Sequence, residues 1–460
     1  NIVNNTLTSA ETQNGYKQNL SAKGKLMNDI DLKGDENNKW TPIGAGNDEK
    51  AYTGTFDGNG YKISGLYINN TSKGFGVGLF GYIGDGSVVK NLGIDGTVIG
   101  ATEAGGIAGV SKGGTITNCY NMADISAFYD VGGVVGDNEK GTITNCYNIG
   151  NVSSVGKYNN TAGGIVGRSY YGYQDDLKGI ISSCYNIGKV NGDHNIGGVV
   201  GQNVGTPINN CYNTGDVSGK EGIGGITGSE DSFNGKISNC YNIGKISGTT
   251  YMGSIVGESS AESILNCYYL KGTADKGVGY NKFNNSKIEI KELTVDKMTG
   301  ANAISNMSGF DTKDESGNNI WYTTPDNLIA GTKNKTDQKY TFIRYFPHLK
   351  AFKGKTDAPY NKMTITQMQK DKDGFYLIYT KEQLETFCNI VNNTLTSDEV
   401  KNNYIENISV KGKLMNDIDL KGDKNNQWTP IGNSTRNYTG VFDGNFYKIS
   451  GLYIDNTSDY

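Results

Sequence analysis

The chain has 460 residues, with 66 glycines, 6 prolines, 35% hydrophobic residues and a formal net charge of −4. Lysine and arginine alternate with acidic residues instead of forming a basic patch, which argues against a nucleic-acid partner. No apolar stretch reaches 18 residues, so we expect no membrane insertion. The many glycines and asparagines indicate frequent turns, because both residues tolerate positive φ.

The longest repeat brings the start of the chain back near its end. The segment NIVNNTLTS at 1–9 returns at 389–397, and KGKLMNDIDLKGD at 23–35 returns at 411–423, both at an offset of 388 residues. Such a return predicts tandem modules. We expect the chain to start inside one module and to stop inside the next, so that targeting cannot be read from its first residues.

An acidic run follows early in each copy. Asp29, Asp31 and Asp35 have oxygen ligands at calcium-like spacing, and the second copy repeats them. No bidentate glutamate follows at the twelfth position of the run, as a calcium loop of the EF-hand type would require. Turn-forming aspartates and a calcium site both remain open, and the turn is favoured.

A shorter repeat, I-x-x-C-Y, fills the middle of the first module. Six copies carry a cysteine: Cys119, Cys146, Cys184, Cys211, Cys240 and Cys267. Two earlier copies carry Leu66 and Leu92 in the same slot, and a glycine-rich motif such as GGVVG at 132–136 separates the copies. β-Branched runs closed by glycine turns, with a period near 27, predict two or three short strands in each turn of a solenoid. The expected fold is all-β, a parallel and right-handed β-helix with short helical caps.

The interchange of cysteine with leucine predicts that this slot faces the core. The six cysteines should therefore be buried free thiols forming a structural ladder. By strand alternation, the following tyrosine faces outward. Two interpretations of this outward row remain open, a possible binding surface for glycan or protein and a stack that stiffens the rod, and stacking is favoured. The row comprises Tyr67, Tyr120, Tyr147, Tyr185, Tyr212, Tyr241 and Tyr268.

These motifs resemble a known repeat family. GTITNCYNIGNVSS and GGVVGDN are similar to the GLUG-motif repeats of bacterial surface proteins. LMNDIDL, WTPIG and YTGTFDGNGYKISGLYI resemble the non-catalytic β-helical region of immunoglobulin A protease-type zinc peptidases. The resemblance covers roughly 20–270 and again 411–460, and it implies a surface location with an undefined ligand.

The remaining segments complete the expected domain plan. We assign 1–273 to the β-helix of the first module, 274–350 to its C-terminal cap, 351–363 to a linker, and 364–460 to the start of the second module. Two short helices are expected within 292–307. Trp321, Tyr322 and the aromatic residues Tyr340, Phe342, Tyr345 and Phe346 should cover the last rung.

The second module should open with a strand at Phe375 and then a helix. Thr380 and Gln383 form a capping box, and Leu384, Phe387, Cys388 and Val391 share one helical face. We expect this helix to close the top of the second β-helix. The first module should lack such a helix, because the chain begins where the helix would end.

No catalytic constellation is evident. His194 and His348 lie far apart in the sequence, and HExxH is absent. We predict no catalytic, cofactor-binding or metal-binding residues, and a non-enzymatic extracellular stalk, adhesin or fibre. Its expected partners are neighbouring copies of the module, end to end, and possible host or matrix glycans or proteins. The alternatives are a carbohydrate-active β-helix lyase or hydrolase, and a glycan-binding module that uses the tyrosine row.

Overall fold

The computed structural model describes residues 2–4, 6–15, 17–71, 76–156, 160–171, 179–231, 235–283, 287–300, 303–323, 327–329, 339–352, 362–368, 370–415 and 417–455. The chain forms two compact units. Unit 1 comprises Asn1–Leu293, Met307–Tyr322 and His348–Pro359, and unit 2 comprises Thr294–Asn306, Thr323–Pro347 and Tyr360–Tyr460. Within the described residues, no helix is long and apolar enough to cross a membrane.

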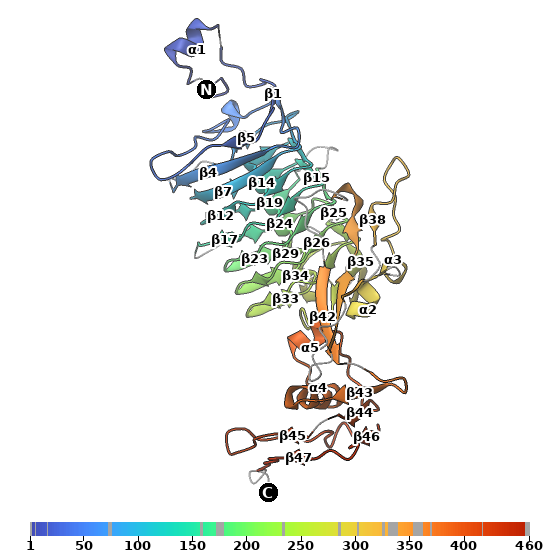
Figure 1. Cartoon of the computed structure of the whole chain (residues 1–460). Coiled ribbons are helices and arrows are strands. Elements are labelled where there is room, and N and C mark those ends of the chain that lie inside the picture. Colours follow the sequence, from blue (N-terminus) through green and yellow to red (C-terminus); the bar gives the residue numbers. More distant parts are fainter. Residues whose placement is uncertain are drawn as a thin grey trace. The chain divides into compact units, whose positions relative to one another are not determined.

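Unit 1 is a parallel β-helix, as the sequence predicted. Its successive strands stack in chain order, from β4 (Lys62–Asn70) to β33 (Thr250–Gly253) (Figure 1). Three sheets form its walls, and the solenoid strands pair in parallel with the rungs before and after them. One rung therefore contains several short strands, which hydrogen-bond to other rungs instead of to one another.

The first wall follows the I-x-x-C-Y motif. Its strands are β1 (Gly24–Lys25), β2 (Ile30–Asp31), β3 (Thr55–Asp57), β4, β6 (Val88–Lys90), β7 (Gly93–Gly100), β10 (Thr115–Thr117), β11 (Tyr120–Asn121), β12 (Asp124–Ala127), β15 (Thr142–Thr144), β16 (Tyr147–Asn148), β17 (Val152–Ser154), β20 (Ile181–Ser182), β21 (Tyr185–Asn186), β22 (Val190–Asn191), β25 (Ile208–Asn209), β26 (Tyr212–Asn213), β27 (Val217–Ser218), β30 (Lys236–Ser238), β31 (Tyr241–Asn242), β32 (Ile246–Ser247), β35 (Ser263–Leu270) and β37 (Lys287–Leu293).

The other two walls follow the glycine-rich motif. The second wall contains β8 (Ala104–Gly105), β13 (Val131–Gly132), β18 (Ala162–Gly163), β23 (His194–Gly197), β28 (Glu221–Gly224) and β33. The third wall contains β5 (Phe80–Ile83), β9 (Ala108–Lys112), β14 (Val135–Glu139), β19 (Val166–Tyr170), β24 (Val200–Val204), β29 (Thr227–Glu230), β34 (Val256–Ser259) and β36 (Val278–Asn281).

Each rung of the first wall bends immediately before its cysteine slot. The bend residue has a φ of 52° to 55° in Asn91, Asn118, Asn145, Ser183, Asn210, Asn239 and Asn266. Asparagine tolerates this left-handed region better than most residues do. An amide contact between rungs is present at two of these bends. Asn118 Nδ2 donates to Asn91 Oδ1 at 3.3 Å, and Asn266 Nδ2 donates to Asn239 Oδ1 at 3.3 Å.

The register of the first two copies differs from the sequence alignment. Ile63 pairs with Ile94, and Val89 pairs with Phe56, so Leu66 does not lie in the cysteine slot. Ile63 thus pairs five residues beyond Val89, with which the sequence alignment matched it, and the register shift between Ile63 and Leu66, where Gly65 has a φ of 63°, changes this offset by only one residue. Leu66 is nevertheless buried. The prediction of a buried slot was correct for Leu92 and assigned the wrong position to Leu66.

A buried asparagine ladder runs through the rungs and was not foreseen. Its members directly follow the motif tyrosines and are fully buried: Asn121, Asn148, Asn186, Asn213 and Asn242. Nδ2 of each of the first four members donates to Oδ1 of the next member at 2.8 Å and to a backbone carbonyl of its own rung. Asn242 ends the ladder, and its Nδ2 donates to Ser254 Oγ at 3.1 Å. The amides thereby satisfy one another where water is absent, which a buried polar group requires.

The glycine-rich motif makes room for this ladder. A Cβ atom on Gly164 would lie 2.3 Å from Cγ of Asn186, and one on Gly198 would lie 2.3 Å from Cγ of Asn213. These glycines are the second of each Gly-Gly pair. The glycine-rich motif and the cysteine motif are therefore sterically coupled.

Short elements accompany the β-helix in unit 1. They are α1 (Ser9–Gln13), the 3₁₀ turns η1 (Asp48–Lys50) and η2 (Lys350–Phe352), and the antiparallel pair β38 (Trp321–Tyr322) and β41 (His348–Leu349). Helix α1 begins with a capping box at Thr8.

Unit 2 contains the predicted helices and the second copy of the module start. Its elements are α2 (Val295–Met298), α3 (Ala303–Asn306), β39 (Asn327–Ile329), β40 (Lys339–Tyr345), β42 (Lys362–Met368), β43 (Phe375–Ile378), α4 (Lys381–Asn392), α5 (Ser397–Lys401), β44 (Lys411–Leu414), β45 (Ile418–Asp419), β46 (Phe442–Asp443) and β47 (Ile449–Ser450). The two short helices and the strand at Phe375 are confirmed. Thr380 caps α4 and accepts a hydrogen bond from Gln383 N at 3.3 Å, as predicted. Strands β43, β44 and β46 pair in parallel, and β39, β40 and β42 pair antiparallel.

The two copies show how strongly a rung depends on its neighbour. Ile63 is 4% exposed beneath β7, whereas its counterpart Ile449 is 40% exposed. Leu66 is 1% exposed and its counterpart Leu452 is 59% exposed. The same sequence is thus buried where a following rung covers it, as in other solenoids, in which stability lies largely in nearest-neighbour contacts.

Truncation of the asparagine ladder tests its contribution to stability. We expect Asn186→Ala to lower the free energy of unfolding, because Oδ1 of Asn213 loses its donor from the preceding rung. Each buried polar group left unpaired costs about 1–3 kcal/mol. Urea denaturation followed by circular dichroism measures the loss. Asn151→Ala, at an exposed position, should change the midpoint little, and equal losses in the two variants would contradict the prediction.

Candidate functional site

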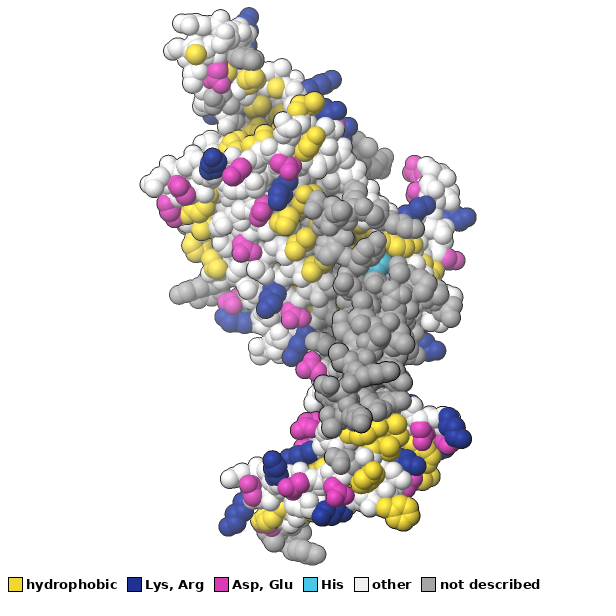
Figure 2. Space-filling model, viewed as in Figure 1, with side chains coloured by type: hydrophobic (Ala, Val, Ile, Leu, Met, Phe, Trp, Pro, Cys, Tyr) yellow, Lys and Arg dark blue, Asp and Glu magenta, His cyan; other side chains and the backbone are white. Residues whose placement is uncertain are grey.

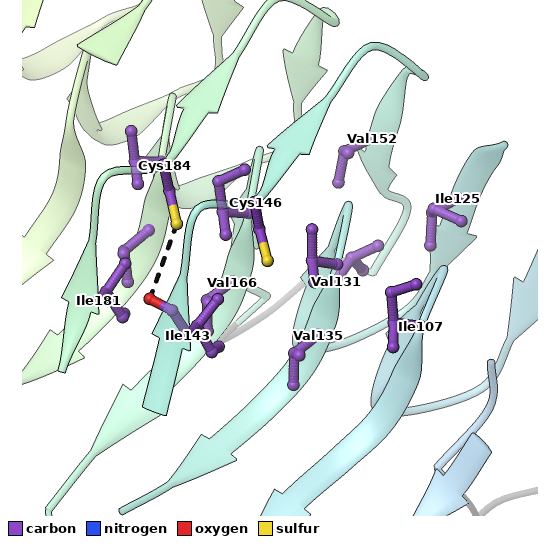
Figure 3. Packing of buried hydrophobic residues seen from close by; sticks show 14 of the residues in the cluster. Ile107, Ile125, Val131, Val135, Ile143, Cys146, Val152, Val166, Ile181 and Cys184 are labelled. Carbon is purple, nitrogen blue, oxygen red and sulfur yellow. Dashed lines mark hydrogen bonds between the residues drawn. The ribbon is translucent and has the colours of Figure 1, made fainter. Parts of the chain in front are cut away.

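The six repeat cysteines form a ladder inside the β-helix. All six are fully buried and free of disulfides. Each thiol lies near backbone carbonyls, as in Cys184, whose Sγ donates to Ile143 O at 3.7 Å (Figure 3). Burial raises the pKa of the thiols of Cys119 and Cys184 well above its ordinary value. A buried thiol with a raised pKa is a poor nucleophile and fills space as a small hydrophobe.

The motif tyrosines stack, but the expectation that they face solvent is wrong for most of them. Neighbouring rings from Tyr120 through Tyr241 have centroids 4.7–5.0 Å apart and are within 6° of parallel. The members between 0% and 3% exposed are Tyr147, Tyr185, Tyr212, Tyr241 and Tyr268. They lie outside the solenoid, as strand alternation requires, and a later segment of unit 1 covers them.

The cover consists of three aromatic side chains from 307–322 and 348–352. Phe352 contacts Tyr147 and Tyr185 edge-on, with centroids 5.3 and 4.9 Å away. Trp321 lies over Tyr212 and Tyr241, and Phe310 lies over Tyr241 and Tyr268. Trp321 therefore covers the side of the ladder, contrary to the prediction that it covers the last rung. The side chains of Tyr340, Phe342 and Tyr345 lie outside the described residues.

The first tyrosine of the predicted row belongs elsewhere. Tyr67 pairs with Thr97, and the residue of its rung that pairs with the tyrosine slot at Gly93 is Lys62. Its hydroxyl donates to the carboxylate of Glu36. Tyr120 and Tyr67 are only partly exposed. The tyrosine ladder is therefore mostly a covered packing surface, and little of it remains open to a ligand.

Two aspartates of the early acidic run, Asp31 and Asp35, serve in turns, and the third, Asp29, bonds to the backbone of a later strand. Asp31 Oδ1 accepts from Lys33 N at 2.9 Å, Asp35 Oδ1 accepts from Asn37 N at 2.7 Å, and Asp29 Oδ1 accepts from Lys62 N at 2.8 Å. Among the described residues, no three His, Cys, Asp or Glu side chains gather as metal ligands would. The turn interpretation accounts for their contacts.

The two histidines lie apart in the fold as well. His194 is in β23 and lies 3.5 Å from Glu221, measured from Nδ1 to Oε2. His348 is in β41, and burial lowers its pKa to about 4. The histidines therefore do not share a site.

The structure reveals a charged depression that the sequence did not indicate, named here the acidic groove. Its volume is about 490 Å³. It is lined by Gly46, Asn47, Asp48, Glu49, Tyr82, Glu103, Val110, Lys112, Asp137 and Tyr170. Acidic side chains outnumber the one lysine in this lining. Charges of both signs are otherwise spread over the visible face of the protein (Figure 2).

Asp137 is the most perturbed group of the acidic groove. It occupies the outward slot of β14, between Val110 and Arg168 on the adjoining rungs. Its Oδ1 is buried and has no hydrogen-bond partner among the described residues. Burial, reinforced by the charge of Asp130, raises the pKa of Asp137 to about 8, and Arg168 opposes the shift. The carboxyl is therefore largely protonated at neutral pH.

Neighbouring groups complete a network of charges. Lys112 forms ion pairs with Asp48 and with Glu139, the latter at 3.7 Å. The hydroxyl of Tyr170 donates to Glu139 Oε2 at 3.3 Å, and Arg168 lies over the Tyr170 ring at 5.1 Å. A carboxyl whose pKa is raised in this way can act as a proton donor at neutral pH. Two of these charged residues, Asp137 and Arg168, directly follow a glycine-rich motif.

The fold and ladders define a parallel β-helix repeat protein, and the comparisons name its repeat. Residues 192–218 match the GLUG motif, so the chain carries the GLUG repeat that its cysteine motif resembled. A provisionally named Gly-rich membrane protein of Evansella cellulosilytica is 36% identical over 85 residues, 18% of this chain and 9% of that protein. Halomucin of Haloquadratum walsbyi is 43% identical over 82 residues, 18% of this chain and 1% of halomucin.

A solved structure was also found. It is a provisionally assigned immunoglobulin A1 protease from Bacteroides ovatus, 19% identical, with a TM-score of 0.41 over 65% of this chain and 84% of that chain. The chain spans less than a tenth of each of the two curated relatives.

The raised pKa of Asp137 predicts a pH-dependent stability. Between about pH 4 and the folded pKa of about 8, the folded protein keeps a proton that the unfolded chain has released. The free energy of unfolding should therefore fall as the pH rises, by at most about 1.4 kcal/mol per pH unit. Asp137→Asn should remove this contribution. The free energy of unfolding of the variant, relative to that of the wild type, should therefore rise between pH 4 and 8. Denaturation at several pH values measures the difference, and a constant difference would contradict the prediction.

Burial of the cysteine ladder predicts unreactive thiols. In the native protein at pH 8, the six repeat cysteines should resist a thiol reagent, whereas all 7 cysteines of the chain should react after denaturation. Spectrophotometric titration counts the reacted thiols. Rapid reaction of the native protein, or disulfides in its mass spectrum, would contradict the prediction that the six cysteines are buried free thiols.

Proposed function

We propose that this chain is a rigid, non-catalytic spacer in an elongated protein of the cell surface. One observation carries the proposal. The same β-helix start, with the same turns and caps, occurs in both units at an offset of 388 residues, as in the capping boxes at Thr8 and Thr396. Identical units in series add length without adding new chemistry.

The contacts between the rungs of unit 1 support the role of a spacer. Hydrogen bonds link the asparagine ladder from rung to rung, and ring stacking links the tyrosine ladder. A solenoid of this kind resists bending, because a bend must open one of its hydrogen-bonded walls. The relatives named as a membrane protein and as halomucin favour a location outside the cell. Partners at the two ends would be further copies of the module.

Electron microscopy of a protein with several 388-residue modules tests the proposal. We expect rods whose length grows with each added module. A module shortened by one 27-residue repeat offers a matched control and should shorten the rod by one rung, about 4.8 Å. Compact particles that do not lengthen would overturn the spacer function.

The acidic groove favours a second candidate, the binding or hydrolysis of an extracellular saccharide. It would use Asp137 as the proton donor, with Tyr82 and Tyr170 as walls of the groove. Incubation with pectins, chondroitin and mucin glycans, followed by a reducing-end assay, tests this candidate. Release of reducing ends by the wild type but not by Asp137→Asn would support this candidate, provided that the variant has unchanged circular dichroism. If no reducing ends are released, only the spacer function remains.

A further inference from the structure

The last rungs of the solenoid in unit 1 carry two stacked and partly exposed tyrosines, named here the tyrosine pair. Tyr251 lies in β33 on the second wall, and Tyr280 lies in β36 on the third wall, next to β34 (Figure 1). The two ring centroids are 4.9 Å apart, and the ring planes differ by 28°. Tyr280 is 43% exposed. Because Tyr251 occupies one face of the Tyr280 ring, the exposed area of that ring lies on its other face and its edge.

Tyr251 has a backbone conformation that few tyrosines adopt. Its φ is 53°, in the left-handed region. The equivalent positions of the two preceding rungs are Asn195, with a φ of 50°, and Gly222, with a φ of 67°. Asparagine and glycine tolerate this region, whereas a bulky side chain is strained in it, and such strain clusters at functional sites. An aromatic ring at this position is therefore expected to have a function of its own.

A carboxyl group lies directly beside the tyrosine pair. Glu258 pairs with Tyr280 of the next rung, so the two side chains leave the same face of the wall about 4.8 Å apart. Burial and the charges of Asp231 and Glu221 raise the pKa of Glu258, and Lys282 opposes the shift. Three carboxyl groups and one lysine thus meet at this end of the third wall. A further positive charge would relieve the repulsion between the carboxylates.

The chemistry of these groups fits a ligand that has both a flat apolar face and an ammonium group. An aromatic face attracts a cation, and a carboxylate accepts strong hydrogen bonds from an ammonium group. A quaternary ammonium such as choline is recognised by a cage of several rings, whereas the tyrosine pair offers one open ring face. A pyranose has a flat apolar face that can lie against a single aromatic ring. An amino sugar therefore matches the pair and its neighbouring carboxylate together.

We propose that Tyr251, Tyr280 and Glu258 form a binding site for an amino sugar with a free amine, carried on an extracellular oligosaccharide. The sugar ring lies against the open face of Tyr280, and Tyr251 supports that ring from behind. Glu258 accepts a hydrogen bond from the ammonium group. The site is separate from the acidic groove, whose lining residues lie between Gly46 and Tyr170. The inference goes beyond the spacer function, and either can fail without the other.

Titration calorimetry of the full chain with a β-linked tetramer of glucosamine tests the proposal. We expect saturable binding. The N-acetylated tetramer should bind about 10-fold more weakly or worse, because acetylation removes the positive charge. Tyr280→Ala and Glu258→Gln should each weaken the binding of the glucosamine tetramer about 10-fold or more, because one removes the ring and the other the negative charge.

Matched variants show whether the tetramer occupies this site. Tyr129→Ala removes another tyrosine that is 40% exposed, and Glu262→Gln removes another exposed carboxylate, so both should leave the affinity unchanged. Circular dichroism checks that all variants fold. No binding at tetramer concentrations up to about 10 mM, or equal binding of the N-acetylated tetramer, would overturn the proposal. So would binding that Tyr280→Ala leaves unchanged and Asp137→Asn weakens, because the tetramer would then occupy the acidic groove.

Discussion

The structure depends on the stacking of like residues at one rung spacing. Parallel strands about 4.8 Å apart place each side chain directly above its counterpart. Any residue of the repeat must therefore tolerate a copy of itself as its nearest neighbour. Asparagine does so by linking amide to amide, tyrosine by parallel ring stacking, and isoleucine and cysteine by apolar contact. The repeat motif is in effect a set of residues that stack on themselves.

This constraint explains what the sequence could predict. Interchange between Leu92 and the repeat cysteines identified the inward slot, because only the core accepts both residues. The period near 27 and the glycine turns predicted the parallel β-helix. The capping box at Thr380 placed α4, since helix ends are read from local residues. Each of these features depends on contacts within one rung or between adjacent rungs.

Other features depend on distant residues and escaped the sequence analysis. The tyrosines looked exposed because their cover, Phe310, Trp321 and Phe352, follows the ladder by many residues and belongs to no repeat. The acidic groove depends on Asp137 and Glu103 from different rungs, together with Asp48 from a turn before them. The pairing of Ile63 with Ile94 was missed because the residue pattern aligned Ile63 with Val89 instead. The repeats therefore predict the solenoid, but they do not predict the aromatic cover or the acidic groove, which depend on residues outside the repeat.

The contact between Gly164 and Asn186 also constrains how this chain can evolve. A side chain at the glycine would collide with the amide, and the amide is bonded to the rungs on both sides. A side chain at Gly164 would also lie 2.2 Å from the backbone oxygen of Gly198, so a change of Asn186 alone would not make room for it, and a change of Asn186 disturbs the amide of the next rung. Drift in one repeat is held back by its neighbours, which favours exchange of whole repeats over gradual divergence. The chain should therefore vary in number and spacing of rungs sooner than in the residues that connect them.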